Sequence, residues 1–262
     1  MRVEDAFTVF DQQDSGCLSY GVERAGRRWF VKTAIELRAA GPMTRVVGLH
    51  RAVRHAAIVR PVAVLPGPTL IYPWRPGRTL NSATVHGGDR SALERFRRLP
   101  GEEIHRALDA VLDAHVAIAA AGWISVDLYD GCFLYDFDGR RMHLIDLDEY
   151  RPGAFVLDAD RLPGSRRYMA PEEWARGATI DERTTVHHLG RTFQQLLTDD
   201  RATRRERAVA ARATDPDPDG RHPTVAALVA DWRPRPGTRP VGDLRASWRI
   251  ARRRGDRREE DS

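Results

Sequence analysis

The spacing of apolar residues along the chain changes near residue 75. Before that point, apolar and polar positions mostly alternate, as they do in strands that bury one face, and one stretch has helical spacing. This part therefore predicts one helix, Met43–Arg54, and five strands: Thr8–Gln13, Cys17–Glu23, Arg28–Thr33, Ile58–Leu65 and Thr69–Tyr72.

After residue 75 the spacing is typical of long amphipathic helices. A hairpin around Asp138-Gly139, with strands Phe133–Phe137 and Arg141–Leu147, interrupts them. The Pro- and Gly-rich residues 74–77 are predicted to form a hinge between a β-rich part, 1–73, and a helical part, 78–232, and the Pro- and Arg-rich residues 233–262 to form a mobile tail. The predicted helices are Gly101–Ala121, Thr184–Thr198, Ala202–Ala213 and Thr224–Trp232.

The composition, 42% hydrophobic and 30% charged, is that of a globular protein. No window reaches the ~18 unbroken apolar residues of a membrane span. The first residues lack the basic start and apolar run of a secretory signal, so a cytoplasmic location is expected. The net charge is +5, but acidic residues are interspersed with the basic ones and only the tail is densely basic, so nucleic-acid binding is not expected.

Lysine occurs once among the 42 basic residues, at Lys32. An ammonium is a compact point charge, whereas a guanidinium is a planar fork. In a chain that uses arginine at every other cationic position, Lys32 is therefore a candidate for a tight site.

Two aspartates, Asp127 and Asp146, flank the predicted hairpin, which brings them to the same end of a small β unit. Such a pair can orient a hydroxyl nucleophile with one carboxylate and bind Mg²⁺ with the other, as phosphoryl transfer requires. Taken alone, the pair is better explained as a turn cap and a strand end.

A family resemblance gives these residues a context. Gly164–Glu172 reads G-S-R-R-Y-M-A-P-E and resembles the G-[ST]-x-x-Y-M-A-P-E stretch of eukaryotic-type serine/threonine protein kinases, including their bacterial members. Further similarities follow in the family's order over residues 8 to about 232: Trp29–Lys32 resembles V-A-I-K, His55–Val59 H-P-N-I-V, Val126–Leu128 R-D-L, Ile145–Asp148 x-D-F-G, and Asp217–Thr224 D-P-x-x-R-P-T.

The resemblance implies an α+β, two-lobed protein kinase-like fold with ATP in the cleft. By that resemblance Lys32 would hold the α- and β-phosphates, and Asp127 would orient the substrate hydroxyl and accept its proton. Asp146 would bind Mg²⁺ or Mn²⁺. Glu172 and Arg221 resemble a buried ion pair that braces the helical lobe.

Residues around the nucleotide follow in the same way. Tyr72 would be the gatekeeper, and Pro73 and Arg75 would face adenine through backbone groups. Gly16 would be the last glycine of the phosphate-covering loop, although a plain strand turn explains it equally well. Ser165 stands where kinases specific for Ser/Thr place a hydroxyl beside the base.

The sequence also departs from the family pattern. Residues 44–46 supply no glutamate for Lys32, and Glu36 is a candidate substitute; Asp130 or Asp148 is a candidate for a lost metal contact. The loop Leu147–Pro163 contains no Ser or Thr, so control by loop phosphorylation is not expected. The other departures are Cys132 for asparagine, Tyr129 for lysine, Ser125-Val126 for His-Arg, and Thr185 for aspartate.

The first functional hypothesis is ATP-dependent phosphorylation of Ser/Thr in a protein substrate. A pseudokinase, which binds nucleotide without turnover, is the first alternative. A small-molecule kinase of the aminoglycoside-phosphotransferase type is the second, although it would not be expected to carry Ala170–Glu172 or Arg221. Cys17 and Cys132 are interpreted as small apolar residues, with a redox pair as the alternative.

Overall fold

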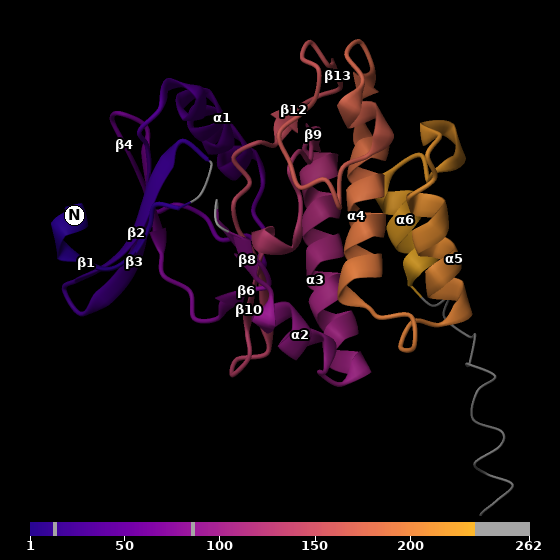
Figure 1. The fold of residues 1–262 in the computed structure, drawn as a ribbon, viewed down its shortest axis with the longest axis horizontal. Coiled ribbons are helices and arrows are strands. Elements are labelled where there is room, and N and C mark those ends of the chain that lie inside the picture. The colour runs from indigo at the N-terminus through magenta and orange to yellow at the C-terminus, as the bar shows by residue number, and fades with distance from the viewer. Residues whose placement is uncertain (13–14, 85–86, 234–262) are drawn as a thin grey trace, which may run out of the picture.

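The computed structural model describes residues 1–12, 15–84 and 87–233, and the fold is α+β. Figure 1 shows the N-terminal sheet and helix α1 at one end of the molecule, and helices α3 to α6 side by side at the other. The short strands and the hairpin lie between these two parts. The division along the chain follows the predicted change of apolar spacing.

The N-terminal sheet has five antiparallel strands in the order β1-β2-β3-β5-β4. Lys32 lies on the central strand, opposite Ser19 on one side and Leu70 on the other. Its backbone is therefore fixed by two neighbouring strands. The strands are β1 (Ala6–Phe10), β2 (Cys17–Arg24), β3 (Arg27–Ala34), β4 (Ala63–Leu65) and β5 (Thr69–Pro73).

Helix α1 spans Leu37–Ala52 and begins six residues before the predicted start at Met43. The predicted start was too late because the first six residues of the helix bury only Ala39 and therefore give no apolar period. Proline removes one backbone hydrogen bond from a helix interior. The helix nevertheless continues through Pro42, because the buried side chains of Met43 and Leu49 hold its inner face against the core.

The chain leaves β5 and crosses close to the hairpin formed by β10 (Phe133–Asp136) and β11 (Arg141–Leu144). Gly77 has a φ of +124°, and a Cβ there would lie 2.6 Å from the carbonyl oxygen of Tyr135. Only glycine permits both this conformation and this approach. Directly afterwards, β6 (Arg78–Thr79) adds a third strand to the hairpin.

Several short elements were not predicted from the sequence. Three-residue strands and one-turn helices bury too few apolar residues to give a periodic signal. Two further strand pairs, β9 with β12 and β13 with β14, lie beside the long helices. The short elements are β7 (Ser82–Thr84), β8 (Gly87–Asp89), α2 (Ser91–Arg97), β9 (Trp123–Ile124), β12 (Arg151–Pro152), β13 (Phe155–Val156), β14 (Thr179–Ile180) and the 3₁₀ turns Val3–Asp5, Asp130–Cys132, Pro171–Trp174 and Pro218–Gly220.

The long helices are α3 (Gly101–Ala120), α4 (Glu182–Leu196), α5 (Arg204–Ala213) and α6 (Val225–Trp232). The starts of α4, α5 and α6 are fixed by polar caps, because Asp181, Thr203 and Thr224 each accept a backbone N–H of the first turn. These caps place the starts of α4 and α5 two residues away from the predicted positions. None of the helices in the described ranges is long and apolar enough to cross a bilayer.

The expected tail, 233–262, lies outside the described residues except for Arg233. The Arg233 guanidinium donates to Asp113 Oδ1 at 2.6 Å and to Asp109 Oδ1 at 3.4 Å, both on α3. The end of α6 is thereby tied to the central helix.

The expected ion pair between Glu172 and Arg221 is present, and both residues are buried. Arg221 donates to both carboxylate oxygens of Glu172, at 2.7 and 2.9 Å, and the hydroxyl of Thr184 donates to one of them at 2.8 Å. Burial alone would raise the pKa of Glu172, but the hydrogen bonds and charge of Arg221 hold it below its ordinary value.

We expect Arg221→Met to lower the free energy of unfolding by about 3–5 kcal/mol, because it leaves a buried carboxylate without its counter-charge. Urea unfolding measures this loss. Arg176→Met is the matched control, since its pair with Asp160 is exposed on both sides and should contribute about 1 kcal/mol or less. A loss no larger than that of the control would contradict the assignment of Glu172–Arg221 as a brace.

Candidate functional site

A cavity of about 580 Å³ lies between the N-terminal sheet and the hairpin. Its walls come from β1, β3 and β5, from the crossing segment after β5, and from residues 145–148 after β11. The lining includes the aromatic residues Phe10, Phe30, Tyr72, Trp74 and Tyr129 and the charged residues Lys32, Asp146 and Asp148. A large apolar pocket with a few charged groups is the usual form of a ligand site.

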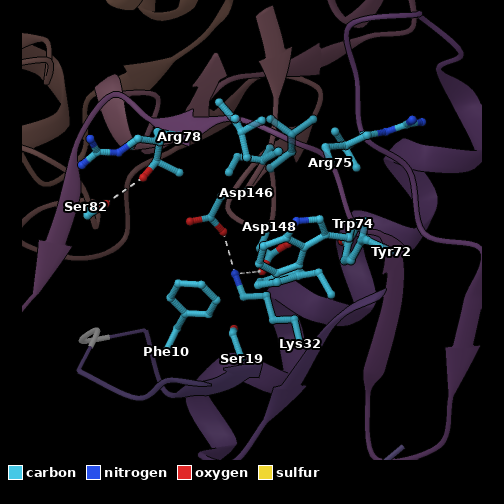
Figure 2. A pocket seen from close by; sticks show the side chains of 18 of the residues that line it. Phe10, Ser19, Lys32, Tyr72, Trp74, Arg75, Arg78, Ser82, Asp146 and Asp148 are labelled. Carbon is cyan, nitrogen blue, oxygen red and sulfur yellow. Dashed lines mark hydrogen bonds and ion pairs between the residues drawn. The ribbon is translucent and has the colours of Figure 1, made fainter. Parts of the chain in front are cut away.

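Lys32 lies between two carboxylates at this cavity. Its Nζ is 2.6 Å from Asp146 Oδ1 and 2.6 Å from Asp148 Oδ2, as Figure 2 shows. Burial would lower the pKa of the ammonium, but the two carboxylates raise it well above its ordinary value. Lys32 is therefore a permanent positive charge, and Asp146, whose side chain is 43% exposed, has an oxygen open to the cavity.

Asp148 therefore supplies a counter-charge to Lys32 that was expected from Glu36. Glu36 was proposed for this role, but its carboxylate pairs with Arg38 at the exposed start of α1. Asp148 was proposed as a metal ligand, but its side chain is only 10% exposed and is held by Lys32. The assignment of Glu36 was wrong, because a carboxylate two residues beyond Asp146 reaches the ammonium directly. The metal role of Asp148 stays a prediction.

Helix α1 contributes a cation where the family pattern has a carboxylate. Arg45 Nε donates to the carbonyl of Tyr150 at 2.9 Å, and its other arm lies 3.3 Å from Glu149. The segment that carries Asp146 is consequently tied to Lys32 of the sheet and to Arg45 of α1. In the pair between α1 and this segment, the helix supplies the cation and the segment supplies the carboxylate.

Asp127 and Asp146 both have left-handed backbones, with φ of 57° and 59°. Such values are uncommon outside glycine but are tolerated best by Asp and Asn, and they cluster at functional sites. The buried thiol of Cys132 donates to the carbonyl of Asp127 at 3.3 Å and contacts that of Asp146 at 3.9 Å. Cys132 thus links the two aspartate backbones.

The carboxylate of Asp127 is only partly accessible to water. Burial, followed by the nearby negative charge of Asp146, raises its pKa to about 7, although the backbone N–H of Ser165 hydrogen-bonds it and opposes the rise. A Cβ on Gly164 would lie 3.5 Å from Asp127 Oδ1, so this segment approaches the carboxylate closely. The predicted neighbours Asp127 and Ser165 are therefore together.

The loop before Asp127 is anchored by side chains of α4. The hydroxyl of Thr185 accepts the N–H of Ser125 at 3.0 Å, so threonine anchors the loop where the family has aspartate. The Ser125 hydroxyl lies 2.7 Å from His188 Nδ1, and His188 Nε2 lies 2.7 Å from Glu173. This buried chain connects the Asp127 loop to the segment after Ala170.

Asp130, the other proposed metal ligand, does not reach the cavity. Its carboxylate is fully buried and accepts hydrogen bonds from Arg167, at 3.1 to 3.2 Å, and from Asn81 at 2.9 Å. The charge of Asp130 is thereby used to hold the loop against the segment that carries Arg167, and the proposal was wrong.

The predicted hinge residues line the same cavity. Tyr72, Pro73 and Arg75 form one wall, and the Trp74 N–H is bonded to the carbonyl of Arg28. The N–H of Arg75, in contrast, has no hydrogen-bond partner within the described ranges. It is available to a ligand in the cavity.

Gly16 does not line the cavity. It has a φ of +66°, and its carbonyl accepts the N–H groups of Ile35 and Glu36, each at 3.0 Å. Between the two interpretations of Gly16, this geometry favours the strand turn over the phosphate loop.

The two cysteines do not support the redox alternative. Both are free and buried, and burial raises the pKa of each thiol. A thiol with a raised pKa forms little of the thiolate that redox chemistry requires. The interpretation of Cys17 and Cys132 as packing residues agrees with the structure.

The residues present fit a nucleotide better than a metal alone. Among the residues that the structure describes, no three His, Cys, Asp or Glu side chains gather as a metal site. A divalent ion here would need phosphate oxygens beside Asp146. The cavity offers a permanent cation, an open carboxylate, apolar walls and a free backbone N–H, which are the groups that a nucleoside triphosphate uses.

Several functional contacts gave no usable signal in the sequence. Asp148 was noted, but not as the partner of Lys32, and the contribution of Phe10 to the cavity was not foreseen. The contact of His188 with Ser125 in the Asp127 loop was not foreseen either. A lone histidine or carboxylate has no periodicity, so its partner is known only once the fold brings them together.

No family model and no curated protein matches the chain in comparisons with known proteins.

We expect Asp127→Asn to stabilise the protein at neutral pH but not at acidic pH. The folded protein keeps Asp127 protonated up to about pH 7, whereas an unfolded chain ionises it near 3.8. As pH rises between these values, the wild type loses stability and the neutral asparagine does not. Asparagine also tolerates the left-handed backbone.

The measurement is the melting temperature of both proteins across this range. The difference should grow from about pH 4 to about pH 7 and stay level above it. A difference independent of pH would contradict the raised pKa of Asp127.

Proposed function

We propose that this protein is a two-lobed, protein kinase-like phosphotransferase that moves the γ-phosphoryl group of ATP to Ser/Thr hydroxyls of a protein substrate. The observation that carries the proposal is the position of Lys32, which lies at a cavity between two carboxylates, one of them open. Asp127 is linked to Asp146 through the thiol of Cys132, and its raised pKa supports a role as the catalytic base. The antiparallel sheet and helical part agree with the fold that the motifs imply.

The roles follow from charge and position. Lys32 would bind the α- and β-phosphates of ATP. The N–H of Arg75 and the apolar wall around Tyr72 would hold the adenine ring. The acceptor oxygen attacks the γ-phosphorus while the bond from that phosphorus to the β–γ bridging oxygen breaks. ADP leaves, and Asp127 accepts the hydroxyl proton.

Asp146 would hold a Mg²⁺ or Mn²⁺ ion, which supplies charge neutralisation of the phosphates. Cys132 offers no second contact to a metal ion. It is fully buried, and a thiol is a poor ligand for a hard ion. We therefore expect phosphoryl transfer to be slow and its rate to depend little on a second metal ion.

The pseudokinase alternative is favoured by a specific observation. Lys32 is engaged by both Asp146 and Asp148, so a nucleotide has to compete with Asp146 for the ammonium. The small-molecule kinase alternative has less support, since the Glu172–Arg221 brace that it would lack is present.

The proposed function predicts that γ-labelled ATP with Mg²⁺ or Mn²⁺ labels at least one of two generic protein substrates, one basic and one acidic. Asp127→Asn should lose at least about a hundredfold in rate, since general-base catalysis contributes about that much or more. Lys32→Met should abolish both the transfer and the rise in melting temperature that ATP causes. If ATP still raises the melting temperature of the wild type but no label moves, the protein is a pseudokinase.

The rate of transfer should also depend on pH in a defined direction. Only ionised Asp127 can accept the proton, and its pKa is about 7, so the rate should rise with pH below that value and level off above it. Initial rates at limiting substrate concentrations, which give kcat/KM and so report the free protein, measure this profile. A rate that stays level below pH 7 would contradict Asp127 as the base.

A further inference from the structure

Three exposed side chains gather beside the Asp127 loop, in the segment between β13 and β14. The guanidinium carbons of Arg161 and Arg166 lie 5.6 and 5.5 Å from the centre of the Trp174 ring. The Trp174 side chain is 39% exposed, which is unusual for so large an apolar residue. We call Arg161, Arg166 and Trp174 the arginine–tryptophan surface.

The backbone beneath this surface is fixed. The N–H of Leu162 donates to the carbonyl of Glu173 at 2.9 Å, which sets Arg161 beside Trp174. The Glu173 side chain is fully buried and accepts the N–H of Ala170 at 2.6 Å. Contacts between the ring and each arginine add about 0.5–1 kcal/mol at an exposed site. The surface is therefore ordered before any partner arrives.

Its charges are not neutralised. Other arginines of the same segment have carboxylate partners: Arg167 pairs with Asp130, and Arg176 with Asp160. Within the described part of the chain, neither Arg161 nor Arg166 lies within ion-pair distance of a carboxylate. Two like charges held beside one ring repel each other, and an incoming carboxylate relieves that repulsion.

The surface lies next to the reactive carboxylate. Ser165, whose backbone N–H bonds Asp127, is the residue before Arg166, and consecutive Cα atoms are about 3.8 Å apart. An extended peptide covers about 3.3 Å per residue. A side chain within about three residues of a hydroxyl at Asp127 can therefore reach these arginines.

We propose that the arginine–tryptophan surface binds acidic side chains flanking the acceptor Ser/Thr of a protein substrate. This inference rests on the proposed function and names its substrate class. Arginine and tryptophan are the residue types that most often dominate binding at protein interfaces. Charge complementarity here selects carboxylates and rejects lysine and arginine around the acceptor.

The test uses fluorescein-labelled peptides with one serine and the full chain. Aspartates follow the serine in one peptide and precede it in a second, while alanines or lysines replace them in two controls. Fluorescence anisotropy at low ionic strength measures binding without requiring catalysis. We expect an aspartate peptide to bind about tenfold more tightly than the lysine peptide, with the difference falling in high salt.

The double variant Arg161→Glu, Arg166→Glu should reverse this preference, and Arg161→Lys, Arg166→Lys should keep most of it. Arg204→Glu is the matched control, because Arg204 is equally exposed but lies on α5. Equal binding of all peptides, or a preference that the double reversal leaves intact, would overturn the proposal. The proposal would also be overturned if single-stranded DNA displaced the aspartate peptide at a concentration below the dissociation constant of that peptide.

Label transfer from γ-labelled ATP to the same peptides separates the two proposals. Charge-selective binding without transfer supports the surface and contradicts the kinase function. Transfer at equal rates to the aspartate, alanine and lysine peptides supports the kinase function and overturns the surface.

Discussion

The burial of one ammonium determines much of this architecture. Lys32 sits on the central strand of the sheet, where a lone charge would be costly to remove from water, and it is neutralised by Asp146 and Asp148 from a segment more than a hundred residues away. The two carboxylates tie the sheet to the chain that follows the hairpin. The cavity is bounded by both, so its shape depends on this ion pair.

The backbone of the Asp127 loop is held by side chains other than those of the pattern that the sequence resembles. Where the kinase pattern has asparagine and aspartate, this chain uses the thiol of Cys132 and the hydroxyl of Thr185, each of which bonds the backbone of the loop. These groups maintain the left-handed aspartates without supplying an oxygen ligand. The loop is thus anchored without the asparagine and the aspartate of the pattern that the sequence resembles.

The sequence predicted the parts that rest on long-range repetition or on fixed spacing. The long helices and the central strands have clear apolar periods, and Glu172 and Arg221 could be paired because each lies in a recognisable motif. The start of α1 was missed because its first six residues bury only Ala39, too few apolar contacts to give a period in the sequence. The partner of Lys32 was assigned to Glu36 instead of Asp148 because sequence proximity does not show which carboxylate can reach a buried ammonium.

Gly77 has a mechanical consequence for the cleft. Its backbone presses against the carbonyl of Tyr135, and Leu80 donates its N–H to the carbonyl of Phe133, so the chain is attached to the hairpin from residue 77 onward. On the other side, β5 is fixed in the sheet as far as Pro73. The Trp74 N–H still donates to the carbonyl of Arg28 on β3, so along this connection any rotation of the sheet relative to the hairpin is concentrated in residues 75 and 76. So short a connection limits how widely the cleft can open.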